Sequence, residues 1–151
     1  MSNPFTVHLI SWHDGEPLLR AIREKVFMQE QGVSAELEWD GLDDISHHAL
    51  ALSANGEALG CGRITPDGHI GRVAVLPEWR HKRIGSAILE LLVDYARSQH
   101  LDQVDLNAQI QAMPLYEQFG FEVEGDVFIE AGIPHRRMTL HLKNRVVHIA
   151  A

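Results

Sequence analysis

The stretch RVAVLPEWRHKRIG, residues 72–85, holds the pattern from which the rest of the chain is interpreted. An apolar run typical of a strand turns at Pro77, four basic residues follow at 80–83, and a run with helical periodicity begins around Gly85. The first amides of a helix lack intrahelical partners and carry partial positive charge, so a strand, a basic turn and a helix in this order favour phosphate binding. Taken alone, such a run is more often a solvated surface turn.

The composition limits what this anion site can serve. The chain has 151 residues and a formal net charge of −8 at pH 7, so no nucleic acid partner is expected. The Walker and Rossmann glycine patterns are absent, which argues against a nucleoside triphosphate or NAD. The N-terminus lacks the features of a signal peptide, and no apolar run reaches the length of a membrane span. We therefore expect a cytoplasmic protein without membrane contact.

Hydrophobic periodicity and turn residues divide the chain into strands and helices. Asn55-Gly56 is typical of a hairpin turn, and Gly32 is expected to end the first helix. Residues 34–46 are acidic and are predicted to be irregular or briefly helical. The expected strands are 6–11, 48–53, 57–65, 69–75, 103–108, 121–130 and 135–142, with a last turn near Gly132 and Pro134, and the expected helices are 16–30, 84–99 and 114–120. This order predicts an α/β layered fold with a mixed sheet.

Residues 80–85, RHKRIG, resemble the phosphate-loop signature of the GNAT superfamily of N-acetyltransferases, Gln/Arg-x-x-Gly-x-Gly/Ala, with Arg83 where the first glycine is usual. Residues 106–121, LNAQIQAMPLYEQFGF, resemble the superfamily's later motif, and residues 26–51 and 128–138 resemble its ElaA/YjcF-like branch. The resemblance implies a single domain over residues 1–151 with a GNAT-like (acyl-CoA N-acyltransferase) fold. Such a fold is a mixed, mostly antiparallel sheet of about six or seven strands flanked by helices.

The resemblance also implies a function. It implies an acetyl-CoA-dependent N-acetyltransferase that acts by direct attack of a primary amine, carried by a small molecule or by a peptide or protein. A homodimer is a further expectation, since members of this superfamily are often dimers. The alternative is a non-catalytic acyl-CoA-binding or sensing domain. The residues that the resemblance implies for binding acetyl-CoA are Val73, Ala74, Val75, Arg80, His81, Lys82, Arg83, Ile84, Gly85, Ser86, Asn107 and Tyr116.

Acetyl transfer to an amine needs a group that takes a proton from the amine and a group that serves the leaving thiolate. The resemblance assigns the second role to Tyr116, for which a core aromatic is the alternative. The base is open among Glu30, His69, Asp126, Glu130 and His135. His69 is our assignment, because it begins the strand before the phosphate loop and histidine titrates near neutral pH. An exposed histidine after an Asp-Gly turn is the alternative for His69.

The acidic segment and the single cysteine are not assigned a catalytic role, and the histidines are not assigned a metal. The acidic segment 36–44 either faces a cationic acceptor or is a solvated loop. Cys61, the single cysteine, lies in an apolar run and is expected to be a small buried residue rather than an acyl nucleophile. The ten histidines show no metal-binding spacing, so we expect no metal.

Overall fold

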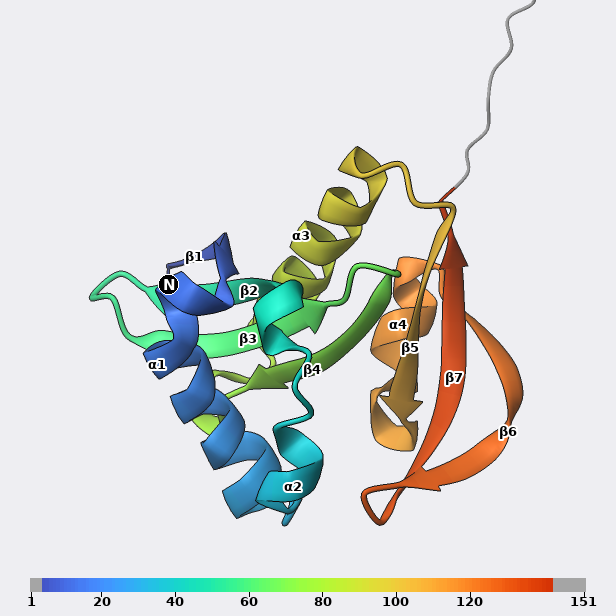
Figure 1. Ribbon diagram of the computed structural model, residues 1–151, viewed down its shortest axis with the longest axis horizontal. Coiled ribbons are helices and arrows are strands. Elements are labelled where there is room, and N and C mark those ends of the chain that lie inside the picture. The colour runs from blue at the N-terminus through green and yellow to red at the C-terminus, as the bar shows by residue number, and fades with distance from the viewer. Residues whose placement is uncertain (1–3, 143–151) are drawn as a thin grey trace, which may run out of the picture.

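The backbone forms one seven-stranded sheet in the order β1-β2-β3-β4-β5-β7-β6 (Figure 1). The computed structural model describes residues 4–142; residues 1–3 and 143–151, which the predicted domain also includes, lie outside it. The strands are β1 Phe5–Ser11, β2 His47–Ser53, β3 Ala58–Ile64, β4 His69–Val75, β5 Gln103–Gln109, β6 Glu122–Glu130 and β7 Ile133–His141. The helices are α1 Trp12–Arg23, α2 Ala35–Glu38, α3 Ile84–Ser98 and α4 Met113–Phe119, with a π-helical segment Glu24–Glu30 and 3-10 turns Asp43–Ile45, Pro77–Trp79 and Ile110–Ala112.

The sheet is antiparallel everywhere except between β4 and β5. Strands β1 to β4 pair in sequence, and β7 lies between β5 and β6. The parallel strands β4 and β5 pair through only two residues each, His69 with Asp105 and Ile70 with Leu106. From there they diverge toward their carboxyl ends (Figure 1). This is the predicted mixed, mostly antiparallel sheet.

Helices α1 and α3 cover opposite faces of the sheet, because successive strand side chains point to opposite faces. Leu50 packs with α1, whereas its neighbours Ala49 and Ala51 pack with α3. On the α3 face, β3 presents Gly60 and Gly62, and side chains of α3 occupy the space where a Cβ would stand. Helix α3 therefore lies close to β3. This contact sets the position of the N-terminus of α3, which follows β4 in the chain.

The first helix begins at Trp12, not at residue 16 as predicted. Ser11 Oγ accepts a hydrogen bond from the backbone N–H of Asp14 at 3.1 Å, which caps the helix. The cap lies before Gly15 and Pro17, two residue types that usually mark turns, and the sequence pattern therefore hid the first helical turn. After Arg23 the helix continues as the π-helical segment.

The other predicted elements are present, with bounds shifted by no more than two residues. The acidic segment contains α2 and a 3-10 turn, which agrees with the prediction of a briefly helical segment. The last hairpin turns at Ala131 and Gly132, which have left-handed φ values of 52° and 77°. Pro134 lies inside β7 rather than in the turn.

Gly62→Ala is expected to destabilise the fold by about 1–3 kcal/mol, the usual effect of adding a methyl group to a filled core. The new Cβ would lie 2.7 Å from Ile88 Cγ2 and 3.0 Å from Leu92 Cδ1, and both side chains are fully buried. Gly71→Ala is the matched control, because a Cβ at this strand glycine meets no heavy atom within 4 Å. Urea unfolding measures both variants, and equal losses would contradict a tight contact between α3 and β3.

Candidate active site

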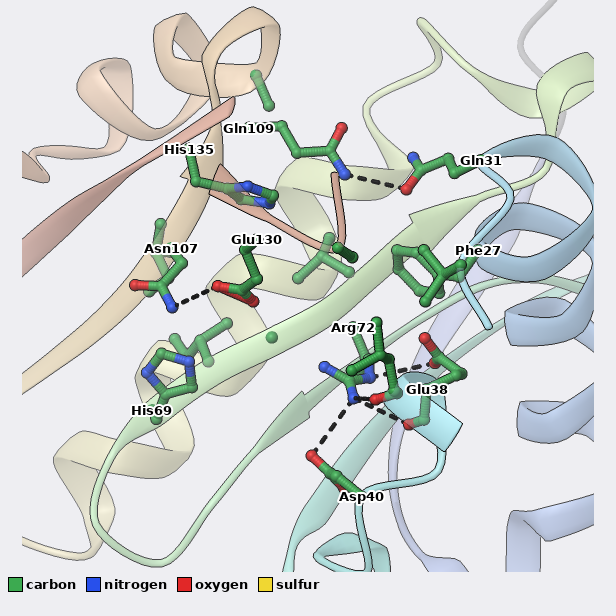
Figure 2. Close-up of a pocket in the computed structure, with 18 of the residues that line it drawn as sticks. Phe27, Gln31, Glu38, Asp40, His69, Arg72, Asn107, Gln109, Glu130 and His135 are labelled. Carbon is green, nitrogen blue, oxygen red and sulfur yellow. Dashed lines mark hydrogen bonds and ion pairs between the residues drawn. The ribbon is translucent and has the colours of Figure 1, made fainter. Parts of the chain in front are cut away.

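A cleft of about 370 Å³ lies where β4 and β5 separate (Figure 2). Residues 69–73 of β4 line it, together with β5, the tip of the β6–β7 hairpin, the π-helical segment and α2. Its volume is in the range of small-molecule sites. Beyond Ile70 the edge of β4 that faces β5 has no partner strand among residues 4–142. The backbone of residues 73–75 can therefore form main-chain hydrogen bonds with a ligand on that edge.

One side of β5 carries a row of polar residues that reach three other elements. Every second residue of this strand is buried, so the intervening polar residues share one face. The contacts of this row are Asp105 with His69 of β4, Asn107 Nδ2 to Glu130 Oε1 at 3.0 Å, and Gln109 Nε2 to Gln31 Oε1 at 3.0 Å. Strand β5 thereby connects the sides of the cleft, as the dashed lines of Figure 2 show for the last two contacts.

His69 lies at the point where β4 leaves β5. Its Nδ1 is 2.5 Å from Asp105 Oδ1, and Asp105 Oδ2 accepts a hydrogen bond from Arg137 Nη2 at 3.1 Å. The His69 side chain is 36% exposed and lines the cleft. His69 is therefore a partly exposed histidine that pairs with a carboxylate, and its role as the base stays a prediction.

Tyr116 lines the cleft from α4 and is 8% exposed. Pro114 in the first turn of α4 and Gly120 at its C-cap, with φ 107°, define the short helix that presents it. Burial raises the pKa of the Tyr116 hydroxyl to about 12. The hydroxyl makes no hydrogen bond to any group in residues 4–142, so at neutral pH it is a protonated donor without a protein partner.

Two of the other predicted base candidates also line the cleft, namely Glu130 and His135. His135 is buried, and its Nδ1 lies 2.6 Å from the carbonyl oxygen of Ile133. A carbonyl only accepts hydrogen bonds, so Nδ1 of His135 carries the proton and Nε2 of the neutral ring is an acceptor. Asp126 is exposed on β6 and does not line the cleft.

The side of the cleft next to α2 is held by six charged residues, four of which are buried. Three arginines from α1, β3 and β4 pair with three carboxylates of the acidic segment: Arg23, Arg63 and Arg72 with Glu38, Asp40 and Asp43. Arg23, 1% exposed, donates to Glu38 at 2.7 Å and to Asp43 at 2.6 Å. Three of the carboxylates of the acidic segment are thus part of a charge-balanced cluster, so the segment is not wholly the solvated loop of one alternative. The other alternative, a surface that faces a cationic acceptor, stays a prediction, and Glu38 and Asp40 line the cleft.

Arg72 joins this cluster to the cleft (Figure 2). It is the extra residue of a β-bulge in β4, with φ 54°, and its Nη2 donates to the carbonyl of Glu38 at 2.8 Å. Asp40 binds both Arg63 and Arg72. Burial alone would raise the pKa of Asp40, but hydrogen bonds from Arg63 and a backbone N–H, with the charges of both arginines, lower it to about 2.

The predicted phosphate loop follows β4 and lies outside the cleft lining. His81 and Arg83 have left-handed φ values of 65° and 69°, and such a backbone can curve several amides around an anion. Arg83 is the N-cap of α3 but its side chain does not cap the helix. The side chains of Lys82 and Arg83 are exposed and form no ion pair within residues 4–142. Their charges are therefore free for a ligand.

Arg80 connects the loop to the π-helical segment. Its guanidinium donates to both carboxylate oxygens of Glu30, at 2.8 and 2.7 Å, and its Nε donates to the carbonyl of Val75 at 2.8 Å. These bonds from Arg80 hold the pKa of Glu30 below its usual value. Glu30 is thus an arginine partner and not a free base, and Arg80 is shared between Glu30 and the end of β4.

The predicted cofactor residues fall into two groups along one path. Val73, Asn107 and Tyr116 line the cleft. The other nine follow it along the end of β4 and into α3: Ala74, Val75 and residues 80–86. Among these, Ile84 is buried in the core, so only its backbone can meet a ligand.

Cys61 lies on the α1 face of β3 and takes no part in the cleft. Its Sγ faces the carbonyl of Arg72 at 3.4 Å, and burial raises the pKa of its thiol to about 12. Among residues 4–142, no three histidine, cysteine or acidic side chains are grouped so that they could hold a metal ion. In the same part of the chain, no helix has the length and apolar character needed to cross a membrane.

Comparison with known proteins places this geometry in a family. The sequence model of the acetyltransferase (GNAT) domain matches residues 20–142. The chain belongs to the GNAT acetyltransferase family. The uncharacterized N-acetyltransferase YjcF of Bacillus subtilis is 36% identical over 121 residues, which cover 78% of this chain and 86% of YjcF.

Two solved structures share the fold. Escherichia coli ElaA has a TM-score of 0.79 at 26% identity, covering 89% of this chain and 98% of ElaA. An acyl-CoA N-acyltransferase from Pseudomonas aeruginosa has a TM-score of 0.78 at 27% identity, and the match covers 90% of this chain and 99% of the Pseudomonas chain. These relatives confirm the predicted GNAT fold and support the ElaA/YjcF-like branch.

Sequence reasoning missed the partners of the candidate catalytic residues. Asp105 and Arg137, which hold His69, were not singled out, nor were Gln31 and Gln109. The alternation in QVDLNAQ, residues 103–109, already places its polar side chains on one face of a strand. Pairing that strand with 69–75 would have brought this face next to His69.

Arg23→Met is expected to cost about 3–5 kcal/mol of unfolding free energy, because buried Glu38 and Asp43 lose their shorter ion pairs and keep only Arg72 and Arg63. Arg97→Met is the matched control. Its ion pair with Asp94 is 3.4 Å long and exposed on both sides, and such pairs contribute about 0–1 kcal/mol. Chemical denaturation measures both. A loss at Arg23 as small as that at Arg97 would contradict the structural role of the cluster.

Proposed function

We propose that this GNAT protein transfers the acetyl group of acetyl-CoA to a primary amine, which attacks the thioester directly. The observation that carries the proposal is the Tyr116 hydroxyl, which stays protonated and has no partner within residues 4–142, on a side chain that lines the cleft. The unpaired edge of β4 at residues 73–75 supports a backbone pairing with the pantetheine arm. The left-handed backbone at His81 and Arg83 and the charges of Lys82 and Arg83, which have no ion-pair partner within residues 4–142, support binding of the pyrophosphate.

In the proposed reaction, His69 Nε2 takes one proton from the ammonium form of the acceptor. The neutral amine then forms a C–N bond with the thioester carbon while the C–S bond breaks. Tyr116 donates a hydrogen bond to the departing sulfur, and the second proton lost by the nitrogen ends on the thiol. The products are an amide, the free thiol of CoA and one proton that His69 returns to water.

The acceptor amine is carried by a small molecule or by a peptide or protein. Glu130 lines the cleft, and within residues 4–142 its bonded partner is the neutral amide of Asn107 and not a cation. This carboxylate supports the approach of an ammonium group. Thiol release from acetyl-CoA over a panel of amines, beside calorimetric CoA binding, tests the proposal. Binding without turnover on any amine would replace it with an acyl-CoA-sensing domain.

Tyr116→Phe is expected to lower kcat by about 10²-fold or more at nearly constant KM, because the hydroxyl acts on the leaving thiolate and not on ground-state binding. The melting temperature should change little, since the ring and its edge contact with Phe121 remain and the lost hydroxyl has no protein partner. Steady-state kinetics and melting curves are measured on the same preparation. A native kcat would remove Tyr116 from the mechanism.

Lys82→Glu and Arg83→Glu are each expected to weaken CoA binding by about 10-fold at low ionic strength, and by much less at high salt, because exposed charges are screened. Arg97→Glu is the control. It makes the same charge change on α3, but in the last turn of the helix instead of at its N-terminus. Calorimetry in low and high salt compares the three variants. Equal CoA affinity in all three would identify residues 80–83 as a solvated surface turn.

A further inference from the structure

His69 is connected to two other strands by a chain of hydrogen bonds that fixes its protonation. Asp105 on β5 faces His69 Nδ1 at 2.5 Å, and Arg137 on β7 donates to the second oxygen of Asp105 at 3.1 Å. A carboxylate only accepts hydrogen bonds, so Nδ1 carries the proton of the neutral imidazole. Nε2, on a side chain that lines the cleft, then has a lone pair with no partner in the described part of the chain.

We propose that Asp105 and Arg137 are positioning residues that fix the tautomer of His69, so that Nε2 accepts the proton of the acceptor amine. This inference rests on the proposed function, in which His69 is the base. The Asp105 side chain is 17% exposed and is held from both sides, whereas that of His69 is 36% exposed. Two other charged groups act on these residues: Asp67 in the turn before β4, which interacts with His69, and Glu124, which shares Arg137 at 3.4 Å.

The cleft contains a second imidazole with the same tautomer but a different anchor. His135 Nδ1 is bound to the backbone carbonyl of Ile133, which no side-chain substitution removes. A change at Asp105 therefore alters His69 and leaves the anchor of His135 in place. Substitution of Asp105 consequently separates the two candidate bases.

Asp105→Asn is expected to reverse the tautomer of His69. Arg137 has only donors, so the amide oxygen of the new side chain must face Arg137, and its NH₂ group must face His69. Nδ1 of His69 then becomes an acceptor, and the ring proton moves to Nε2, where it blocks proton uptake. Asp105→Ala imposes neither tautomer. The conservative variant is therefore expected to be the slower one, the reverse of what a merely structural role predicts.

The expected losses in kcat are about 10²-fold or more for Asp105→Asn and about 10-fold for Asp105→Ala, since general base catalysis contributes about 10²–10⁴-fold. Arg137→Met in the Asp105→Asn background should recover part of the rate, because the amide can then turn its oxygen to His69. Glu124→Gln is the control and should keep the native rate and pH profile, since Arg137 retains its bond to Asp105. Asp105→Asn as fast as the native protein, or faster than Asp105→Ala, would overturn the proposal.

Nitrogen-15 NMR of the histidine rings tests the tautomer without any substrate. The native His69, assigned by its loss in His69→Gln, should show a protonated Nδ1 and a bare Nε2 above neutral pH, and Asp105→Asn should reverse the two. A protonated Nε2 in the native protein would overturn the proposal. A native protein with the expected tautomer that turns over no amine would instead refute the proposed function and leave the tautomer assignment intact.

Discussion

The length of one parallel ladder determines where this molecule can bind a ligand. Strands β4 and β5 are joined through His69–Asp105 and Ile70–Leu106 and then diverge. Just beyond the last pair, β4 bulges at Arg72, and the polar face of β5 lines the cleft. The separation leaves one edge of β4 unpaired beside Tyr116, and the same strand leads directly to the loop that begins α3. The placement of the unpaired edge of β4, of the Tyr116 side chain and of the loop at residues 80–86 therefore depends on the point where the two strands part.

The opposite side of the cleft depends on charge rather than on apolar packing. The acidic segment has exposed apolar side chains, such as Leu37 and Leu42, and its anchoring comes from the ion pairs with Arg23, Arg63 and Arg72. Buried ion pairs contribute little net stability compared with apolar contacts, but losing one partner is costly. The cluster is therefore better understood as a device that fixes one position of α2 than as a source of stability.

Periodicity and turn residues predicted nearly every element, because strands and helices are decided by neighbours in the chain. The exception was the start of α1, where the Ser11 cap outweighs Gly15 and Pro17. The contacts of the candidate site were harder to predict than the elements. Resemblance indicated Tyr116 and the loop at 80–86, but the pairs Arg23–Glu38 and His69–Asp105 join residues 15 and 36 positions apart. Such contacts are set by sheet order and by the packing of α1, and neither leaves a local pattern in the sequence.

The protonation states in the cleft are fixed by the protein before any substrate arrives. Tyr116 retains its proton because burial raises the pKa of its hydroxyl. His69 and His135 both hold the proton on Nδ1, the first through a carboxylate and the second through a backbone carbonyl. The Tyr116 hydroxyl of α4, a hydrogen-bond donor, thus shares the cleft with the acceptor nitrogens of His69 on β4 and His135 on β7. Neither the donor nor the acceptors require the site to rearrange. Because the anchor of His69 is a side chain with its own partner, its tautomer can be changed by substitution, while that of His135 is tied to the fold of the hairpin.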